Sequence, residues 1–249
     1  MKSIALVGAS GRMGERLGAL ISESDDLEVT VRVDAGQTID QQAGDHRVDC
    51  VIDFSVIEQV IPTLNWADRQ GVPVVLGTTG LESSQLTALQ TATQSVPVVW
   101  APNFSVGVNA MFAVAAELVS LVGEGWDLEL VEAHHRHKVD APSGTARRLI
   151  ELLAAARDTT YESAARFGRE GQVGARTDTE IGVNVVRGGS VVGTHEVHYL
   201  GSGEELTLTH RATDRDIFAR GALRACRWLL SNTGRSPALY DMGDVLRYS

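Results

Sequence analysis

The sequence lacks the features that mark several large classes of protein. No apolar run approaches about 18 residues, the length at which a helix can span a membrane. The first residues enter a strand-like run and leave no room for a signal peptide. Only two cysteines occur, Cys50 and Cys226, and both lie in apolar runs, so we expect buried free thiols in a reducing compartment. These absences predict a cytoplasmic protein without a membrane partner.

Positive charge is scarce as well. Lys and Arg number 22 against 32 Asp and Glu, a formal net charge of −10 over 249 residues. Because nucleic acids and anionic membranes bind basic surfaces, this balance argues against charge-driven binding to either. Lysine is especially rare: only Lys2 and Lys138 occur, and the other residues in the Lys and Arg count are arginines. With 43% hydrophobic residues, the chain can still build a core.

The first part of the chain alternates strand-like and helix-like segments. A short apolar run at Ser3–Val7 is followed by four runs rich in Val and Ile: LEVTVRVD, VDCVIDFS, VPVVLGTTG and VPVVWAPNF. Helix-like stretches lie between the later runs, at Val56–Gln70 and Glu82–Thr93, and Pro62 either kinks the first of these helices or delays its start. Strands that alternate with helices predict a doubly wound parallel sheet over residues 1–105.

The pattern changes after residue 105 and predicts a second, α+β part. The expected elements are a helix at Val106–Val122, a strand from Leu128 into HHRHK, a helix from Ser143 to Ala156, a mobile loop at 157–178, strands at Glu180–Arg187, Ser190–Leu200 and Glu205–Thr213, and helices at Ile217–Asn232 and Tyr240–Arg247. Because Gly188-Gly189 and Gly201-Ser202-Gly203-Glu204 have the composition of hairpin turns, we expect a mostly antiparallel sheet with helices on one face.

A glycine-rich turn follows the first strand and precedes a helix. In Gly8-Ala9-Ser10-Gly11-Arg12-Met13-Gly14 the glycines let the backbone approach a pyrophosphate, and the helix N-terminus offers N–H groups and partial positive charge. Asp34 ends the second strand, where an acidic residue accepts hydrogen bonds from an adenosine ribose. The alternative is a plain turn with a solvated Asp. The strand–turn–helix context favours a dinucleotide.

Two further loops follow parallel strands at their carboxyl ends, where ligands of open α/β sheets bind. They are Gly77-Thr78-Thr79-Gly80 and Ala101-Pro102-Asn103-Phe104. Such loops are often rich in Gly or Pro for purely structural reasons, so their spacing does not decide between a binding role and a structural one.

The segment from Glu132 to Thr145, EAHHRHKVDAPSGT, gathers groups that bind and protonate a small acid. His134, His135 and His137 stand beside Lys138, and a lysine can give up a proton where an arginine cannot. Ser143-Gly144-Thr145 then opens a helix whose N–H groups can hold an anion such as a carboxylate. These groups predict a site at which a small acid is protonated.

Other interpretations of the basic residues remain open. His135 and His137 share one face of an extended segment, but no paired Cys or His motif supplies a third metal ligand, so we expect no metal. A merely solvated basic segment would explain neither Lys138 nor the helix start. His195, His198 and His210 are expected to be ordinary sheet residues. Arg215 fits an anion contact and a surface ion pair equally well.

Five segments together resemble the 4-hydroxy-tetrahydrodipicolinate (dihydrodipicolinate) reductases of bacterial lysine and diaminopimelate synthesis. They are GASGRMG, GTTG, APNFSVGVN, EAHHRHKVDAPSGTA and DMGDVL, and the similarity spans essentially the whole chain. The resemblance implies a Rossmann domain of residues 1–105 and 216–249. It also implies a domain of residues 106–215 that binds a dicarboxylate substrate and whose sheet drives assembly of a homotetramer.

The resemblance also implies an activity and residue roles. The activity is reduction of (2S,4S)-4-hydroxy-2,3,4,5-tetrahydrodipicolinate to tetrahydrodipicolinate by NADH or NADPH, with loss of water. His134 and Lys138 would supply protons. The residues implied to bind substrate are His135, Ser143, Gly144, Thr145 and Arg215. Those implied to bind the dinucleotide are Gly8, Ala9, Ser10, Gly11, Arg12, Met13, Asp34, Gly77, Thr78, Thr79, Ala101, Pro102, Asn103 and Phe104.

Two departures from the family pattern affect the cofactor region. Ala35 stands where many members carry Arg, so NADH is expected to be at least as good as NADPH, and the short stretch from Asp34 to Val48 predicts a trimmed helix. Two rival functions are a Rossmann reductase of another small imine or amino acid and a non-catalytic regulator that senses NADH. The regulator leaves the HHRHK and SGT residues without a role, and turnover would exclude it.

Overall fold

The computed structural model describes residues 1–231 and 235–247, and the chain divides into two compact units. Unit 1 consists of Met1–Val106 and Asp216–Ser249, and unit 2 of Gly107–Arg215. Among the described residues, no helix combines the length and the apolar character that a membrane crossing requires.

Unit 1 is built on a six-stranded parallel sheet. In spatial order the strands are β11 (Ala238–Tyr240), β5 (Pro97–Trp100), β4 (Val74–Leu76), β3 (Cys50–Asp53), β1 (Lys2–Val7) and β2 (Leu27–Val33). The predicted doubly wound parallel sheet is confirmed, and its carboxyl-terminal edge carries the glycine turn and the loops that follow β3, β4 and β5.

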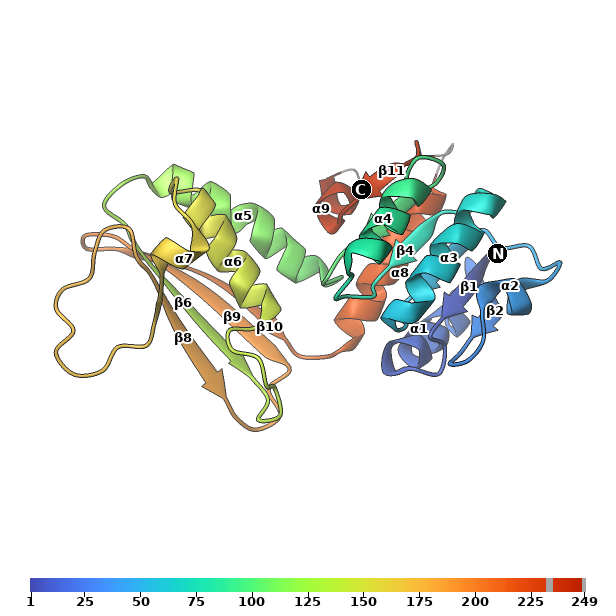
Figure 1. The fold of residues 1–249 in the computed structure, drawn as a ribbon. Helices are drawn as coiled ribbons and strands as arrows, with labels where there is room; N and C mark the ends of the chain where they lie inside the picture. Colours follow the sequence, from blue (N-terminus) through green and yellow to red (C-terminus); the bar gives the residue numbers. More distant parts are fainter. Residues whose placement is uncertain (232–234, 248–249) are drawn as a thin grey trace. The chain divides into compact units, whose positions relative to one another are not determined.

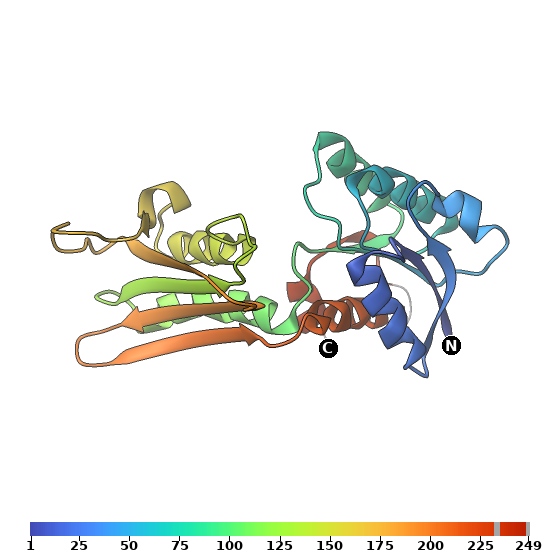
Figure 2. The ribbon, with the colours of Figure 1, turned by 90° about the horizontal axis from the view of Figure 1, so that it is seen from below.

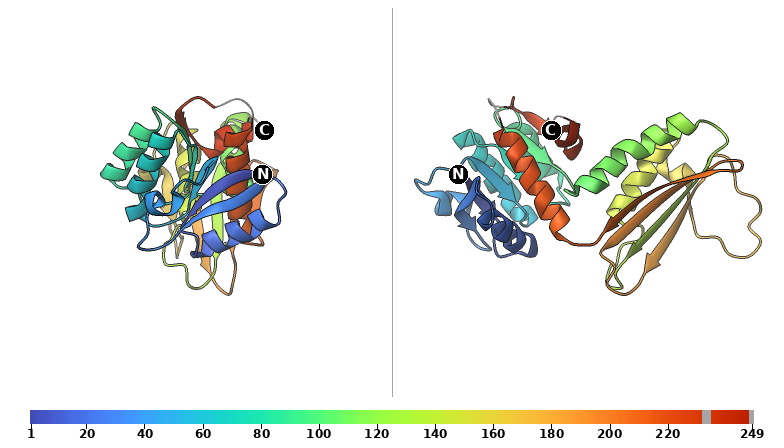
Figure 3. Two further views of the ribbon diagram at one scale, coloured as in Figure 1. Left: turned by 90° about the vertical axis from the view of Figure 1, so that its right-hand side faces the viewer. Right: turned by 180° about the vertical axis from the view of Figure 1, so that it is seen from behind.

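Both faces of this sheet are buried along its inner strands, which explains why β3, β4 and β5 are largely apolar, whereas the edge strand β2 also carries Glu28, Thr30 and Arg32. Side chains alternate across β1: Ile4 and Leu6 pack into one hydrophobic cluster, whereas Ala5 and Val7 pack into the other. The helices of the first cluster are α1 (Arg12–Ser22), α8 (Asp216–Leu230) and α9 (Met242–Arg247), and those of the second are α2 (Ile39–Ala43), α3 (Ile57–Gln70) and α4 (Ser83–Ala92). Figure 1 shows α3 and α4 on one side of the sheet, and the rear view in Figure 3 shows α8 on the other.

Unit 2 packs two helices on one face of a five-stranded mixed sheet. The helices are α5 (Val106–Val122), which begins at the last residue of the first segment of unit 1, and α6 (Gly144–Ala155). The strand order is β10 (Glu205–Ala212), β9 (Gly193–Leu200), β6 (Asp127–His134), β8 (Ile181–Arg187) and β7 (Ala165–Phe167). The pairs β10–β9 and β9–β6 are antiparallel, and β6–β8 and β8–β7 are parallel. The predicted α+β class is confirmed, with a mixed rather than a mostly antiparallel sheet.

Only one of the two predicted hairpins exists. Figure 2 shows the tight turn that joins β9 and β10, as expected from Gly201–Glu204. The hairpin predicted at Gly188-Gly189 is wrong, because β6 lies between β8 and β9. The backbone N–H of Gly188 donates to the carbonyl of His134, and Gly189 accepts from Arg136. The glycines therefore pair with the turn that follows β6 and carry the chain past the end of that strand.

Several predicted boundaries change. Helix α3 begins at Ile57 although Pro62 lies inside it, which excludes the delayed start. The loop expected at 157–178 contains α7 (Tyr161–Ala164), whose cap Thr160 pairs with Ser163, and then β7. The short α2 confirms the trimmed helix after Asp34. The tail contains β11 before α9, and the helix end predicted at Asn232 lies outside the described residues.

Candidate active site

The glycine turn of unit 1 is shaped by close backbone contacts. Gly8 has φ of +80°, and a Cβ there would lie 2.6 Å from the carbonyl oxygen of Phe54. A Cβ on Gly14 would lie 2.1 Å from the carbonyl oxygen of Gly8. The N-cap of α1 is Gly11, which has no side chain to make a capping hydrogen bond. The turn therefore exposes backbone at the start of α1, which is the surface that a pyrophosphate needs.

Asp34 is held against this turn. Its Oδ1 accepts a hydrogen bond from the backbone N–H of Ser10 at 2.6 Å. The backbone N–H of Asp34 donates to Gln37 at 2.9 Å, which fixes the loop after β2. Ala35, the next residue, is exposed and carries no charge. The acidic side chain is thus in place beside the turn, with no cation adjacent to it in the sequence.

A cavity of about 720 Å³ lies at the same edge of the sheet. It is lined by three segments: Arg12 and Met13, Phe54–Glu58, and Gly77–Gly80. The structure thus brings together five of the predicted dinucleotide residues, namely Arg12, Met13, Gly77, Thr78 and Thr79. Sequence reasoning missed Phe54–Glu58, although their place directly after β3 was a usable signal. A Cβ on Gly77 would lie 2.3 Å from the Phe54 ring, so a glycine is required for this packing.

Asp53 ties together two of the loops that line the cavity. Its Oδ1 accepts hydrogen bonds from the backbone N–H and hydroxyl of Ser55, at 3.0 and 2.6 Å, and from the hydroxyl of Thr78 at 3.0 Å. The carboxyl is fully buried, and burial raises its pKa. Trp100 Nε1 donates to the carbonyl of Thr78 at 3.3 Å, which fixes that loop from a second side.

The loop at Ala101–Phe104 is mostly part of the core. Ala101 and Phe104 are buried, and the Phe104 ring packs on Phe54 with 5.3 Å between centroids. Asn103 Oδ1 accepts from the backbone N–H of Ser105 at 2.8 Å, and Pro102 is exposed. None of these four residues lines the cavity, so their expected contact with the dinucleotide stays a prediction.

In unit 2, the inward alternation of β6 places a carboxylate in the core. Glu132 is fully buried and accepts hydrogen bonds from His134 Nδ1 at 2.6 Å, from both terminal nitrogens of Arg187 at 2.7 and 2.8 Å, and from the backbone N–H of Ser143 at 2.9 Å. Burial alone would raise the pKa of Glu132, but these hydrogen bonds lower it to about 2. Glu132 is therefore ionised at neutral pH.

His134 ends β6 with its two ring nitrogens in different surroundings. Nδ1 meets Glu132, and Nε2 lies near β9, where a Cβ on Gly193 would approach it to 3.0 Å. The ring also makes an edge contact with His195 at 5.1 Å between centroids. The side chain keeps 12% exposure, so the ring is held firmly yet remains accessible at the surface.

Lys138 lies in the loop between β6 and α6. Its Nζ contacts Asp140 at 2.9 Å, and this contact lowers the pKa of the Asp140 carboxyl. Arg187 donates to the backbone carbonyl of Asp140 at 2.7 Å, so the side chain that pairs with Glu132 also holds the lysine loop. The electrostatic effect of Lys138 reaches both His135 and His195.

Ser143 has a supporting place rather than an open one. It is buried, it caps α6 by accepting from Ala146 N at 3.1 Å, and its hydroxyl bonds to His195 Nε2 at 3.0 Å. Burial, and then the charge of His134, lowers the pKa of His195 to about 4, so this ring is neutral. His195 was expected to be an ordinary sheet residue and is instead part of the site.

The remaining predicted substrate residues lie around this centre. Gly144 and Thr145 are the first residues of α6, and Gly144 is exposed. The pKa of His135 is lowered by desolvation and by the charge of Arg215, which places that arginine near it. Among the described residues, no group of three or more His, Cys, Asp or Glu side chains is arranged to hold a metal ion.

Comparison with known proteins gives one consistent result. The family model described as the N-terminus of dihydrodipicolinate reductase matches residues 2–104, and that of the C-terminus matches residues 107–246. A 4-hydroxy-tetrahydrodipicolinate reductase of Myxococcus xanthus is 44% identical over 98% of this chain and 97% of its own. One of Akkermansia muciniphila is 44% identical over 100% and 99%.

A solved structure has a similar fold. It is a dihydrodipicolinate reductase from Paenisporosarcina with dipicolinate bound, with a TM-score of 0.75 and 22% identity over 97% of each chain. The predicted family resemblance is therefore confirmed.

Proposed function

The chain belongs to the dihydrodipicolinate reductase family and is an NAD(P)H-dependent 4-hydroxy-tetrahydrodipicolinate reductase of lysine and diaminopimelate biosynthesis, and we propose the roles that its own residues take in that reaction. The observation that carries these roles is the meeting of His134, the Lys138 loop and the start of α6 around one buried carboxylate, Glu132.

Unit 1 has the features that a dinucleotide site requires. Gly8 and Gly14 allow the close backbone packing of the turn before α1, and Gly11 leaves the start of that helix without a side-chain cap, so its N–H groups can hold a pyrophosphate. Asp34 is the group that would accept from the ribose hydroxyls, and Arg12, Met13 and the loop at Gly77–Thr79 line the adjoining cavity. When bound, the reduced nicotinamide supplies the hydride.

In unit 2, we assign proton donation to His134 and Lys138. Reduction of the substrate requires loss of one water and addition of one hydride and one proton, and the proton must reach the enamine carbon left after hydride addition. His134 is accessible at one edge while Glu132 holds the other, and Lys138 carries protons of its own nearby. These two groups can therefore protonate a small acid at this end of the sheet.

The substrate carboxylates are assigned to the groups around this donor. The backbone at Gly144 and Thr145 opens α6, where the helix dipole favours an anion, and Ser143 holds that opening in place. Lys138, His135 and Arg215 supply positive charge or N–H donors to the same region. Ser143 acts through the helix start, because its own hydroxyl is committed to His195 and Ala146.

Three finer expectations complete the proposal. NADH is expected to serve at least as well as NADPH, because Ala35 offers no cation to a 2′-phosphate. The homotetramer and the cytoplasmic location expected from the family stay predictions.

The proton-donor roles are tested by His134→Gln and Lys138→Ala. Each should lower kcat about 10²–10⁴-fold, as removal of a general acid does. The affinity for dinucleotide should stay close to wild type, since the glycine turn lies in unit 1. The assay is oxidation of NADH and NADPH with enzymatically generated substrate, with dinucleotide affinity measured by fluorescence. A near-wild-type kcat in either variant removes that residue from the assignment, and absence of turnover in wild type favours a binding regulator.

The carboxylate site is tested with pyridine-2,6-dicarboxylate, a planar molecule that carries two carboxylates. It should inhibit competitively with substrate, and Lys138→Ala should bind it at least tenfold more weakly, which corresponds to about 1.4 kcal/mol. Calorimetry with and without NADH checks both points, and Arg69→Met, an exposed position in unit 1, is the control. Unchanged affinity in Lys138→Ala would place the carboxylates elsewhere.

A further inference from the structure

We infer that Glu132 and Arg187 form a positioning pair for His134, in which Glu132 fixes the ring tautomer and Arg187 balances the carboxylate charge. The inference deepens the proposed function and rests on His134 being a proton donor. Neither residue was singled out by the sequence, and neither takes a proton in the reaction.

The tautomer follows from the contacts of Glu132. Its two oxygens accept from four N–H donors at 2.6–2.9 Å, two of them on Arg187, one on the Ser143 backbone and one at His134 Nδ1. Because Glu132 is ionised, it has no proton to donate, so the hydrogen of its contact with His134 must lie on Nδ1. Neutral His134 is thereby the Nδ1–H tautomer.

This assignment leaves Nε2 as the reactive nitrogen. Within residues 1–231 and 235–247, no hydrogen bond reaches Nε2 of His134, and the nearest constraint is the small residue Gly193. Neutral Nε2 has a lone pair that takes up a proton, and the imidazolium then donates it from the same atom. A carboxylate behind Nδ1 stabilises that charged form, as in other histidine acids and bases.

Arg187 limits how strongly Glu132 stabilises the charged form of His134. A fully buried carboxylate whose only ionic partner was His134 would favour the imidazolium form more strongly, and the ring would then release its proton less readily. The two-point contact of the guanidinium neutralises Glu132 and fixes its plane. The same guanidinium holds the Asp140 carbonyl, so one side chain sets both the histidine and the lysine loop.

The titratable and charged groups that face His134 come from every neighbouring strand and from the loop after β6. They are Glu132 on β6, Arg187 on β8, His195 on β9 with His210 beside it on β10, and His135, Lys138 and Asp140 in the loop. Asp140 pairs with Lys138, whereas Glu132 is the carboxylate that contacts the His134 ring, so the contact of Glu132 with Arg187 is the one that a single substitution can shift.

The test is the pH profile of kcat/KM for Arg187→Met. Donation requires protonated His134, so kcat/KM falls as pH rises. Without the arginine, Glu132 favours the imidazolium, and this alkaline fall should move to higher pH by about one unit or more. Arg187→Lys keeps the charge and should leave the alkaline fall in place. Arg227→Met, which removes a similar two-point contact with Asp26 in unit 1, is the matched control.

If Glu132 and Arg187 had only a structural role, the outcome would be different. Arg187→Met would then lower kcat/KM by the same factor at every pH, and the alkaline fall would not move. That result would overturn the charge-balancing role.

The tautomer can be tested on the wild-type protein, without any variant and without an activity assay. In a solid-state 15N spectrum of histidine-labelled wild type above neutral pH, His134 should show a protonated Nδ1 and a bare Nε2. A protonated Nε2 would overturn the inference. If His134→Gln kept its turnover, the proposed donor role would fail, whereas the tautomer result would stand on its own.

Discussion

Asp34 contacts the glycine turn without a cationic neighbour, and this single position bears on the choice of cofactor. Its carboxylate favours the hydroxyls of an NADH ribose and repels the extra phosphate of NADPH. Arg12, exposed at the start of α1 and lining the cavity, is the one cation of the turn that can partly offset this repulsion. The balance should therefore favour NADH modestly.

Replacement of Ala35 by Arg should shift this balance toward NADPH. The new guanidinium can bind the 2′-phosphate at two points, and about 1.4 kcal/mol corresponds to a tenfold change in the ratio of kcat/KM values. Ala35→Met adds length without charge and should leave the ratio unchanged. Steady-state kinetics with both cofactors measure it. A wild-type preference for NADPH of tenfold or more would show that Arg12 dominates the pocket.

The candidate site could be predicted from the sequence only where its residues are close in the sequence. His134, Lys138 and the start of α6 fall within one segment, so their chemistry could be read directly. Arg187 and His195 reach the site through strand pairing, since β8 and β9 flank β6, and nothing in their local sequence indicates this. Glu132 lay within the motif, but its burial follows from the alternation of β6 and the partners that neutralise it.

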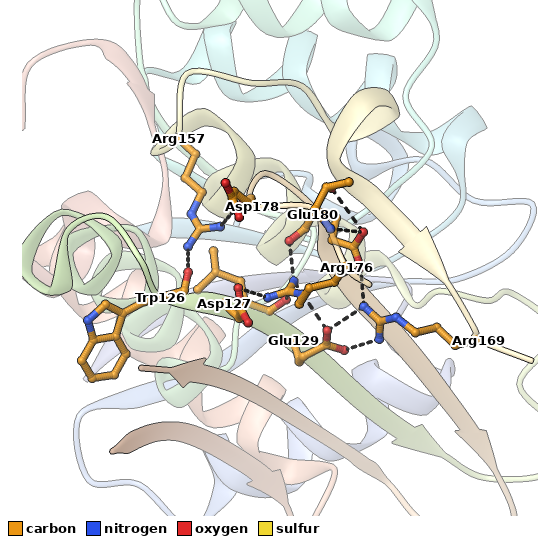
Figure 4. A network of polar contacts seen from close by, with 10 residues as sticks. Trp126, Asp127, Glu129, Arg157, Arg169, Arg176, Asp178 and Glu180 are labelled. Atoms are coloured by element: carbon orange, nitrogen blue, oxygen red, sulfur yellow. Dashed lines mark hydrogen bonds and ion pairs between the residues drawn. The ribbon is translucent and has the colours of Figure 1, made fainter. Parts of the chain in front are cut away.

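At the scale of elements, the segment after β7 is fixed by charges rather than by secondary structure. Arg169 contacts Glu129 on β6 at 2.9 Å and Glu180 at 2.5 Å, while Arg176 contacts Asp127 at 2.5 Å (Figure 4). The pKa of Glu180 is lowered to about 2, chiefly by Arg169. These contacts explain how residues 168–180 stay ordered without a helix or strand.

Removal of Arg176 should loosen this segment. Ion pairs of this exposure contribute about 1 kcal/mol, so Arg176→Met should speed cleavage near the exposed Val173 by about fivefold. Limited proteolysis with thermolysin, which cuts beside apolar residues, measures the rate. High salt should accelerate cleavage of wild type in the same direction. Arg69→Met is the control, and equal cleavage rates in wild type and Arg176→Met would contradict the role given to these charges.

The elements themselves were predictable where periodicity is strong. The alternating strands and helices of unit 1 and the capped start of α6 follow from apolar spacing and from Ser143. The order of strands in unit 2 could not be read in the same way, because Gly188-Gly189 has the composition of a hairpin and yet joins strands that are not neighbours. The three-residue β11 is too short for any periodic signal and is defined only by its pairing with β5.

For the whole molecule, buried titratable groups tie stability to pH. His195 has a pKa lowered from 6.5 to about 4, so the unfolded chain takes up a proton first as the pH falls. The contribution of His195 to stability is therefore fully present above pH 6.5 and is lost progressively as the pH falls to about 4. Glu132, whose pKa falls from 4.5 to about 2, adds a loss in the same direction at lower pH.

His195→Gln should reduce the loss of stability that His195 causes as the pH falls. Glutamine can keep a hydrogen bond to Ser143 but does not titrate, so the fall in unfolding free energy between pH 6.5 and 4 should shrink by at most about 3 kcal/mol. Urea unfolding at fixed pH values measures this difference. His46→Gln, at an exposed position, should leave the wild-type slope intact. A slope that persists in His195→Gln would assign the acid sensitivity to other groups.

The division of unit 1 between two chain segments has a consequence for synthesis. Residues 1–106 leave the ribosome first, but the sheet face that carries Ile4 and Leu6 is covered in part by α8, which follows the whole of unit 2. Unit 2 is continuous and can complete its core before α8 emerges. Unit 2 can therefore complete its core before unit 1 does, although N-terminal domains generally fold first. Until α8 emerges, a nascent chain leaves the part of the apolar sheet face that α8 covers open to solvent.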